Sequence, residues 1–144
     1  MFNHLFVVES DPASYVLRYL EEQINQHNIN VTGFADYRPL AMFVQDTANR
    51  LIAGISGYTW AGCCEIAFLW VHPDYRQMGY GRKLLQTAET EAIQRACQLV
   101  VLSSYSFQAP DFYQKLGYTV TGVDEGCPPG HRRYHLHKRL DGNL

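Results

Sequence analysis

The stretch that decides the fold of this chain runs from Glu65 to Leu85 and reads EIAFLWVHPDYRQMGYGRKLL. It begins with a bulky apolar run typical of a strand, passes a proline, and enters an amphipathic helix through a turn that contains Gly79 and Gly81. Glycines let a backbone approach a ligand closely, and the free N–H groups at a helix N-terminus attract negative charge. The stretch therefore predicts a strand–turn–helix unit that holds a phosphate group.

The next apolar run, Leu99-Val100-Val101-Leu102, extends this unit by one more strand. A nearly continuous apolar run is expected of a strand that is buried on both faces of a sheet. The helix between the two strands spans about residues 79–97, and the crossover from strand to helix to strand is right-handed in almost all known proteins. We therefore expect the strand that begins the unit and the strand that ends it to run parallel.

The flanking segments predict antiparallel strands and further helices. Asp11 before Pro12 is a typical helix start, which places a helix over residues 11–27 after a short strand at residues 5–8. Short turns connect the strands of a meander. The remaining predicted elements are strands over residues 39–45, 50–60, 63–71, 118–123 and 132–138 and a short helix over residues 109–116. Together they predict an α/β (α+β) fold with one mixed, mostly antiparallel sheet in a single domain, residues 1–144.

Composition narrows the class of protein. A chain of 144 residues with 47% hydrophobic and 18% charged residues is typical of a globular protein with a real core. The net charge of -2 argues against a nucleic-acid-binding protein. Apolar runs are too short to span a bilayer, a secretory leader is not recognisable, and the four cysteines lack CxxC spacing. We therefore expect a soluble cytoplasmic protein with no membrane partner.

The glycine turn does not match the common nucleotide loops. A P-loop requires Gly-Lys-Ser/Thr where this chain has Gly81-Arg82-Lys83, and a dinucleotide fingerprint requires a third glycine. The turn instead resembles motif A of the GCN5-related N-acetyltransferase superfamily, Arg/Gln-x-x-Gly-x-Gly/Ala, here Arg76-Gln77-Met78-Gly79-Tyr80-Gly81. A second segment, Ala109-Pro110-Asp111-Phe112-Tyr113-Gln114-Lys115-Leu116-Gly117-Tyr118, resembles motif B of the same superfamily. The family often has Asn where this chain has Ser106.

The resemblance implies a fold and a cosubstrate. The fold is a sheet of about six or seven strands flanked by about four helices, with a parallel pair of strands at the cosubstrate cleft. The cosubstrate is acetyl-coenzyme A (acetyl-CoA), with its pyrophosphate on the backbone of the turn and its pantetheine arm beside the strand. By position, the residues implied to bind it are Leu69, Trp70, Val71, Arg76, Gln77, Met78, Gly79, Tyr80, Gly81, Arg82 and Ser106.

The reaction that the resemblance implies is direct acetyl transfer to a primary amine. Such an amine is mostly protonated at neutral pH, and Glu65, directly or through a water, is our candidate base; a solvated charge at the strand end is the competing interpretation. Tyr113 is the candidate acid for the departing thiolate, because the family often uses a tyrosine at this position. An N–H near Trp70 is the candidate donor to the developing oxyanion.

Several alternatives remain open at this point. A non-catalytic acyl-CoA-binding regulatory module would keep the same motifs. His131, His135, His137 and Cys127 lack the spacing of a zinc site, so we expect no metal. The acceptor is undetermined among polyamines, aminoglycosides, amino acids and protein termini, and a homodimer is compatible with the family.

Overall fold

The structure, a computed structural model, describes Met1 and residues 3–142. Its internal contacts divide the chain into two compact units, Met1–Ala35 and Asp36–Leu144. The first unit contains α1 (Ser14–Thr32), which ends at Gly33 in the left-handed conformation with φ of 76°. The predicted helix start at Asp11 is wrong, because the first helical residue is Ser14 and Ala13 is the N-cap. The predicted strand at residues 5–8 is also wrong, since these residues are not in a strand. The single-domain organisation stays a prediction.

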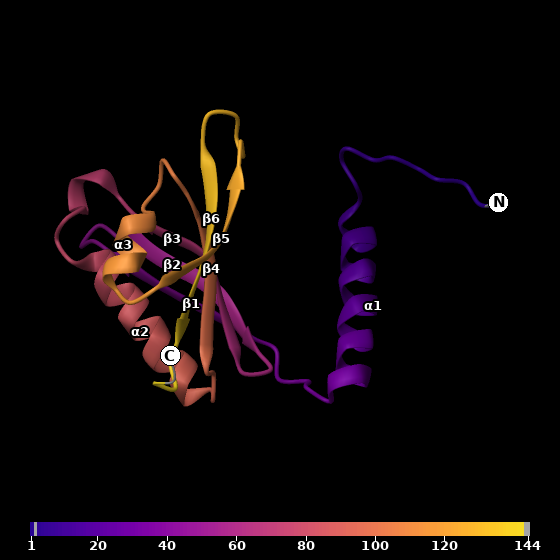
Figure 1. The fold of residues 1–144 in the computed structure, drawn as a ribbon, viewed down its shortest axis with the longest axis horizontal. Coiled ribbons are helices and arrows are strands. Elements are labelled where there is room, and N and C mark those ends of the chain that lie inside the picture. Colours follow the sequence, from indigo (N-terminus) through magenta and orange to yellow (C-terminus); the bar gives the residue numbers. More distant parts are fainter. Residues whose placement is uncertain (2, 143–144) are drawn as a thin grey trace. The chain divides into compact units, whose positions relative to one another are not determined.

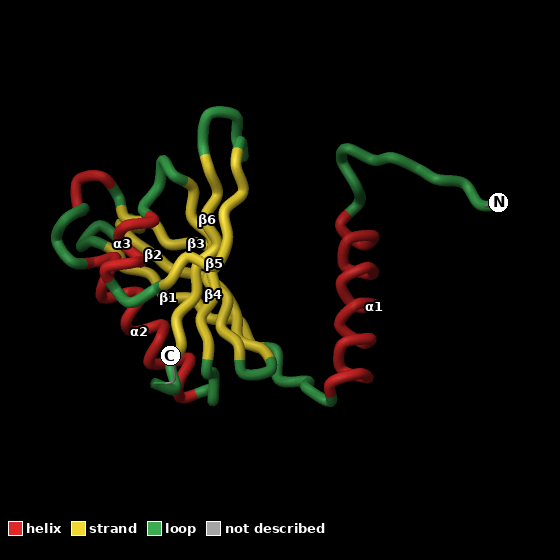
Figure 2. Tube along the Cα trace, viewed as in Figure 1, coloured by secondary structure: helices red, strands yellow, loops and turns green. Residues whose placement is uncertain are grey.

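The second unit is built on one sheet, drawn in Figures 1 and 2. Among the described residues the sheet has six strands in the order β1-β2-β3-β4-β6-β5. Their bounds are β1 (Arg38–Gln45), β2 (Leu51–Trp60), β3 (Cys63–Val71), β4 (Leu99–Tyr105), β5 (Thr119–Glu125) and β6 (Arg132–Arg139). Every neighbouring pair is antiparallel except β3 and β4, which run parallel as predicted.

The helices of this unit lie on one face of the sheet (Figure 1). They are α2 (Tyr80–Gln94) and α3 (Pro110–Lys115), and a short 3₁₀ turn, Pro73–Tyr75, precedes α2. With α1 this makes three α-helices over the residues that the structure describes, one fewer than the resemblance implied. No helix in the described part of the chain is both long enough and apolar enough to cross a membrane.

The core forms between α2 and the sheet because apolar residues on each element alternate with the period of that element. Leu84, Leu85, Ala88 and Ala92 are the buried positions of α2 and repeat at helical spacing. On β4 every second residue is buried: Val100, Leu102 and Ser104. The side chains of β4 therefore alternate between the helix-covered face of the sheet and the opposite face.

The two parallel strands separate after a short pairing. β3 and β4 pair only at Cys63, Cys64 and Glu65 on β3, although both strands continue well beyond that point. On its other side β3 carries a bulge, because Ala67 has no partner on β2 between the pairs Ser56–Phe68 and Gly57–Ile66. A bulge bends the strand that contains it. The bend thus coincides with the position where β3 leaves β4, and the sheet opens there.

Candidate active site

A cleft of about 920 Å³ occupies the opening between β3 and β4. Its walls come from β3, the turn after β3, the start of α2, the end of β4 and α3. These are the segments that carry the two sequence motifs, which are about thirty residues apart in the chain. The fold therefore brings both motifs to one cavity, at the edge of the sheet opening.

The N-terminus of α2 forms one wall of the cleft. Its N-cap, Gly79, has φ of 88°, its N-terminus has no side-chain cap, and its first turn contains no acidic residue. Gln77 also has a positive φ, 60°, so the turn places two left-handed residues two positions apart. Backbone N–H groups in such a turn converge on one point and make an anion site. The geometry fits a pyrophosphate.

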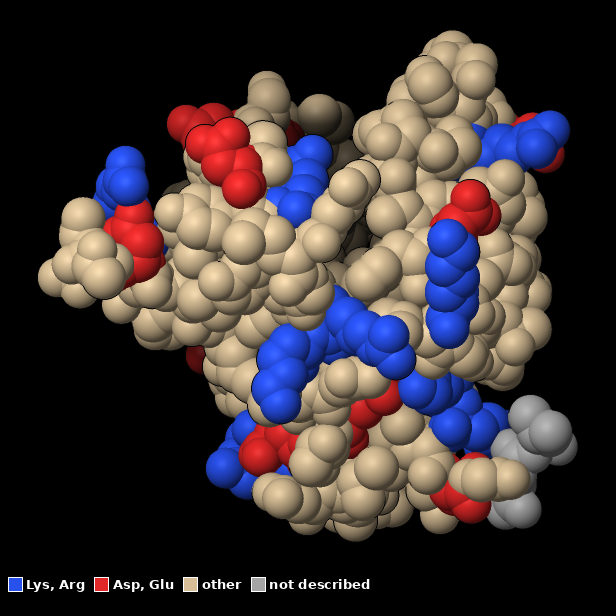
Figure 3. All heavy atoms as spheres, turned by 90° about the vertical axis from the view of Figure 1, so that its left-hand side faces the viewer, with Lys and Arg blue, Asp and Glu red and all other residues tan. Residues whose placement is uncertain are grey.

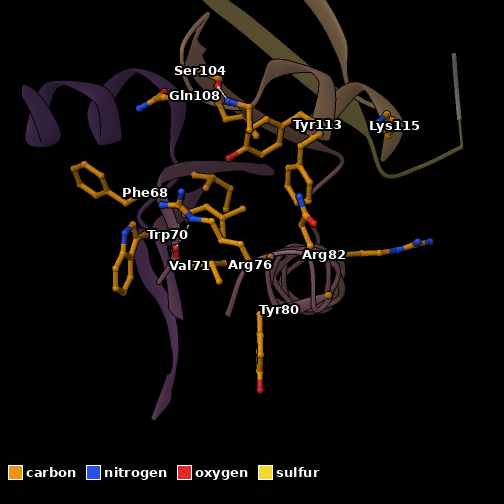
Figure 4. A pocket seen from close by; sticks show the side chains of 18 of the residues that line it. Phe68, Trp70, Val71, Arg76, Tyr80, Arg82, Ser104, Gln108, Tyr113 and Lys115 are labelled. Atoms are coloured by element: carbon orange, nitrogen blue, oxygen red, sulfur yellow. Dashed lines mark hydrogen bonds between the residues drawn. The ribbon is translucent and has the colours of Figure 1, made fainter. Parts of the chain in front are cut away.

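Positive side chains border the same wall. The residues that line the cleft include Arg76, Arg82 and Lys115 and, among those described, no carboxylate. In the space-filling view of this side, Lys and Arg side chains border a hollow (Figure 3). The side chain of Arg76 is partly engaged, since its Nε donates a hydrogen bond to the carbonyl of Val71 at 3.0 Å. Arg82 projects outward from α2 (Figure 4).

Gly81 keeps the cleft open where α2 meets α3. A Cβ atom at this position would lie 3.4 Å from the ring of Phe112 and 3.7 Å from a methyl group of Val71. Any longer side chain would fill the space between the turn and α3. The small residue therefore preserves a narrow, extended cavity between β3 and the helices, which suits an elongated cosubstrate such as acetyl-CoA.

Tyr113 lies on α3 with its hydroxyl directed into the cleft (Figure 4). Its ring is 9% exposed and has edge-on contacts with Phe112 and Tyr118, at centroid distances of 5.1 and 5.7 Å. Burial raises the pKa of Tyr113 to about 12. The phenol therefore stays protonated at neutral pH and can donate a hydrogen bond or a proton to a group in the cleft.

Glu65 lies at the last paired position of the parallel strands, opposite Val101. Its side chain is exposed on the sheet face that α2 and α3 leave open, and it is not among the residues that line the cleft. The hydroxyl of Tyr58 donates a hydrogen bond to the carboxylate of Glu65. This bond and burial raise the pKa of Tyr58 to about 12, so Tyr58 remains the donor and the carboxylate the acceptor.

Most of the predicted binding residues line the cleft, but two do not. Leu69, Trp70, Val71, Arg76, Gln77, Gly79, Tyr80, Gly81 and Arg82 all contribute to its walls. Met78 is not among the lining residues. Ser106 is not among them either. Its hydroxyl accepts a hydrogen bond from the backbone N–H of Arg132 at 3.1 Å. His72, directly after β3, accepts a hydrogen bond from the N–H of Asp74 and so caps the 3₁₀ turn.

The prediction missed the lining residues after β4. Phe107, Gln108 and Ala109 complete the wall between β4 and α3, and Ser103 and Ser104 line its end. The predicted strand stopped at Leu102, whereas β4 continues to Tyr105. The sequence carries no alternation that would extend the strand, because Ser103 and Ser104 are adjacent and both polar; the burial of every second residue, Leu102 and Ser104 among them, is a property of the structure.

The cleft is lined by side chains from both faces of the sheet. Leu69, Val71, Leu102, Ser104 and Tyr113 line it from the helix-covered side. Phe68, Trp70 and Ser103 alternate with these residues along the strands and line it from the opposite side. Figure 4 shows Phe68 and Trp70 projecting to one side of β3, with Tyr113 and Arg82 on the other. The one cleft therefore contacts residues of both faces of the second unit's sheet.

Comparisons with known proteins agree with this geometry. The sequence profile described as the Acetyltransferase (GNAT) family matches residues 6–118. The chain is 30% identical over 113 residues to a blasticidin-S acetyltransferase of Streptomyces morookaense, covering 76% of this chain and 83% of that protein. The profile match alone spans more than half of the chain, which shows a shared family rather than a shared local motif.

Solved structures show the same fold. An acetyltransferase from Bacillus cereus ATCC 14579 is 30% identical, with a TM-score of 0.80 over 92% of this chain and 97% of that one. An aminoglycoside 6'-N-acetyltransferase, whose structure contains coenzyme A, shares the fold at 17% identity, with a TM-score of 0.65 over 92% of this chain and 83% of that one.

The observed sheet, with its single parallel pair and its cleft between the two motifs, is the architecture implied by the sequence resemblance. Acetyl-CoA is the acetyl-donating cosubstrate of these enzymes, and the uncapped turn before α2 suits its pyrophosphate. The chain belongs to the GNAT family of acetyltransferases.

Proposed function

We propose that this protein transfers the acetyl group of acetyl-CoA directly to a primary amine of a small molecule or peptide. The observation that carries the proposal is the cleft where the sheet opens, which has an uncapped helix N-terminus and a protonated phenol on one face of the sheet and a neighbouring carboxylate on the other face. A relative that is named blasticidin-S acetyltransferase and is 30% identical supports a small-molecule acceptor.

Binding of the cosubstrate uses the turn and the free edge of β3. The backbone N–H groups after Gln77 and at the start of α2 hold the pyrophosphate, and Arg76 and Arg82 add positive charge. The edge of β3 beyond Glu65 has no pairing with β4, so it can hydrogen-bond to the amides of the pantetheine arm as an added strand would. When bound, the cosubstrate supplies the activated acetyl group.

The chain's own residues handle the protons. Glu65, directly or through a water, takes the proton that the ammonium of the acceptor must lose before it can attack. The hydrogen bond from Tyr58 holds the carboxylate in one orientation while leaving its other lone pairs free. A backbone N–H near Trp70 donates to the oxygen on which negative charge develops. As the new C–N bond forms and the C–S bond breaks, Tyr113 donates its phenolic proton to the departing sulfur, and the second proton that the nitrogen loses restores the phenol.

The test separates transfer from binding. Tyr113→Phe keeps the buried ring and removes the hydroxyl, so the Kd for acetyl-CoA by calorimetry should stay unchanged while kcat on an amine panel falls about 100-fold. Tyr134→Phe is the matched control, because Tyr134 is a half-buried tyrosine of the same unit outside the cleft, and it should retain full activity. Unchanged turnover in Tyr113→Phe would remove its role as acid.

The amine panel itself tests the proposed activity, with thiol release from acetyl-CoA as the readout. Tight cosubstrate binding without turnover on any amine would favour a regulatory acyl-CoA-binding protein instead. Glu65→Gln should lower kcat/KM without disturbing the fold, since the amide oxygen can still accept the hydrogen bond from Tyr58.

A further inference from the structure

The opening of the cleft on the sheet face away from α2 and α3 is rich in exposed aromatic rings. Phe68 and Trp70 on β3 line it on one side, and Phe107, after β4, lines it on another. These three residues are 75%, 44% and 56% exposed among the described residues. Aromatic rings at this density in a binding cleft commonly contact a ligand, because they combine large contact area with few rotatable bonds.

Phe107 is held in a fixed orientation although it is exposed. Its ring stacks on Tyr105 with a centroid distance of 5.2 Å and an interplanar angle of 6°, and it meets the ring of His131 edge-on at 5.0 Å. Behind Tyr105 the guanidinium of Arg133 lies 5.8 Å from the ring centroid, and Ser103 accepts two hydrogen bonds from that guanidinium, at 3.2 and 3.0 Å. The ring of Phe107 is therefore pre-positioned before any ligand arrives.

β3 also carries a carboxylate, Glu65, on the same face of the sheet as Phe68 and Trp70. Glu65 pairs with Tyr58 on β2 and Phe68 pairs with Ser56. Tyr58 and Ser56 are two residues apart on β2, which corresponds to about 7 Å along that strand. A ring bound against Phe68, Trp70 and Phe107 could therefore be joined by a short linker to an amine beside the carboxylate of Glu65. The negative charge of Glu65 complements the positive charge of an ammonium group.

We infer that the acceptor is a primary amine joined by a linker of about two carbons to a planar, π-bonded ring, and that Phe68, Trp70 and Phe107 bind that ring. This inference rests on the proposed acetyl transfer and adds the chemical class of the acceptor. A polyamine would match the carboxylate but would leave the aromatic opening without a partner. A ring-bearing amine satisfies both features at the spacing that the strands impose.

A matched pair of amines tests the inference. 2-Phenylethylamine and 2-cyclohexylethylamine have the same linker and the same number of carbons, but only the first has a planar π ring. We expect the wild-type protein to acetylate the phenyl compound with a kcat/KM about 10-fold higher than that of the cyclohexyl compound. Calorimetry on the CoA-loaded protein should show the same preference in Kd.

Phe107→Leu keeps an apolar side chain and removes the ring, so it should reduce the preference to less than about threefold. Phe43→Leu is the control, because Phe43 is an exposed ring of β1 outside the cleft, and its preference should remain that of the wild type. Equal kinetics and equal Kd for the two amines in the wild type, or an unchanged preference in Phe107→Leu, would overturn the inference.

Two further outcomes separate the ring site from the cosubstrate site and from the transfer step. If Phe107→Leu weakens CoA binding and leaves the amine preference intact, the ring serves the adenine of the cosubstrate and the inference is wrong. If the CoA-loaded protein binds the phenyl amine preferentially but never acetylates it, the ring site stands and the proposed acetyl transfer fails instead.

Discussion

Replacing Gly57 by alanine is expected to disturb the sheet at the point where it opens. A Cβ atom at Gly57 would lie 1.9 Å from the carbonyl oxygen of Glu65 and 3.0 Å from the Cα of Ile66. Both are backbone atoms of β3, so the contact cannot be relieved by a side-chain rotation. To restore an ordinary contact, β3 must move by about 1 Å beside its bulge, in a densely packed sheet.

The expected cost follows from that displacement. Overpacking of a well-packed site costs about 1–3 kcal/mol, and a clash with backbone belongs at the upper end, about 3 kcal/mol. For a chain of this size the midpoint of thermal unfolding should then fall by about 10 °C. Because the moved atoms include Glu65, kcat/KM on an amine should also fall while the Kd for acetyl-CoA changes less.

Gly54→Ala is the control for this prediction. Gly54 lies on the same strand, and its added Cβ would meet a backbone oxygen at 3.3 Å, a contact that needs only a few tenths of an ångström of adjustment. Calorimetric melting of the two variants, with cosubstrate binding measured in parallel, compares them directly. If Gly57→Ala unfolds at the same temperature as Gly54→Ala and the wild type, the bulge does not depend on this glycine and the reasoning is refuted.

Three further perturbations have expected outcomes. Glu89→Ala should lower the free energy of unfolding, measured in urea, by about 2–3 kcal/mol, because Glu89 accepts hydrogen bonds from Tyr118 and Lys138, both at 3.0 Å, and its loss leaves the ammonium of Lys138 without this partner. Adding Lys138→Met to this variant should restore part of the lost stability, whereas strictly additive effects of the two substitutions would argue against the pairing. The stability of the wild type should fall steeply above pH 10. In the unfolded chain tyrosines lose their protons near pH 10, whereas burial raises the pKa of folded Tyr113 to about 12, and burial beside Glu89 also raises the pKa of folded Tyr118. Each of these two tyrosines therefore lowers the free energy of unfolding by about 1.4 kcal/mol for every pH unit between its unfolded and its folded pKa. Urea titrations of Tyr113→Phe should show a shallower fall of stability with pH than the wild type, and an identical slope would contradict this. Arg82→Glu should weaken acetyl-CoA binding about 10-fold at low salt and less at high salt, whereas a salt-independent loss would indicate a structural role.

Much of the motif-bearing half of this fold follows from local sequence. The strand bounds predicted from the apolar run, 63–71, coincide with β3, because a bulky run bounded by a glycine turn and a proline leaves little choice of ends. The helix after Gly79 and the parallel return strand were confirmed as well. These elements are specified by patterns within a few residues.

Features that depend on distant partners could not be predicted. The apolar run at residues 5–8 has the composition of a strand but is not one, since a strand also requires a partner. α1 runs on to Thr32 through a polar segment, and Gly33, which lies beyond the predicted helix end, is its left-handed cap. The bulge of β3 beside Gly57, which coincides with the separation of β3 from β4, is visible only in the register of two strands.

The lining of the cleft from both faces of the sheet also bears on the order in which ligands come and go. If both ligands used one side of the cleft, the first to bind would obstruct the second. Here the uncapped turn and Tyr113 line the cleft on one face of the sheet and the aromatic rings line it on the other, so we expect neither ligand to obstruct the other. Steady-state rates measured over a grid of both concentrations should therefore give intersecting double-reciprocal lines, and each product should be able to dissociate first.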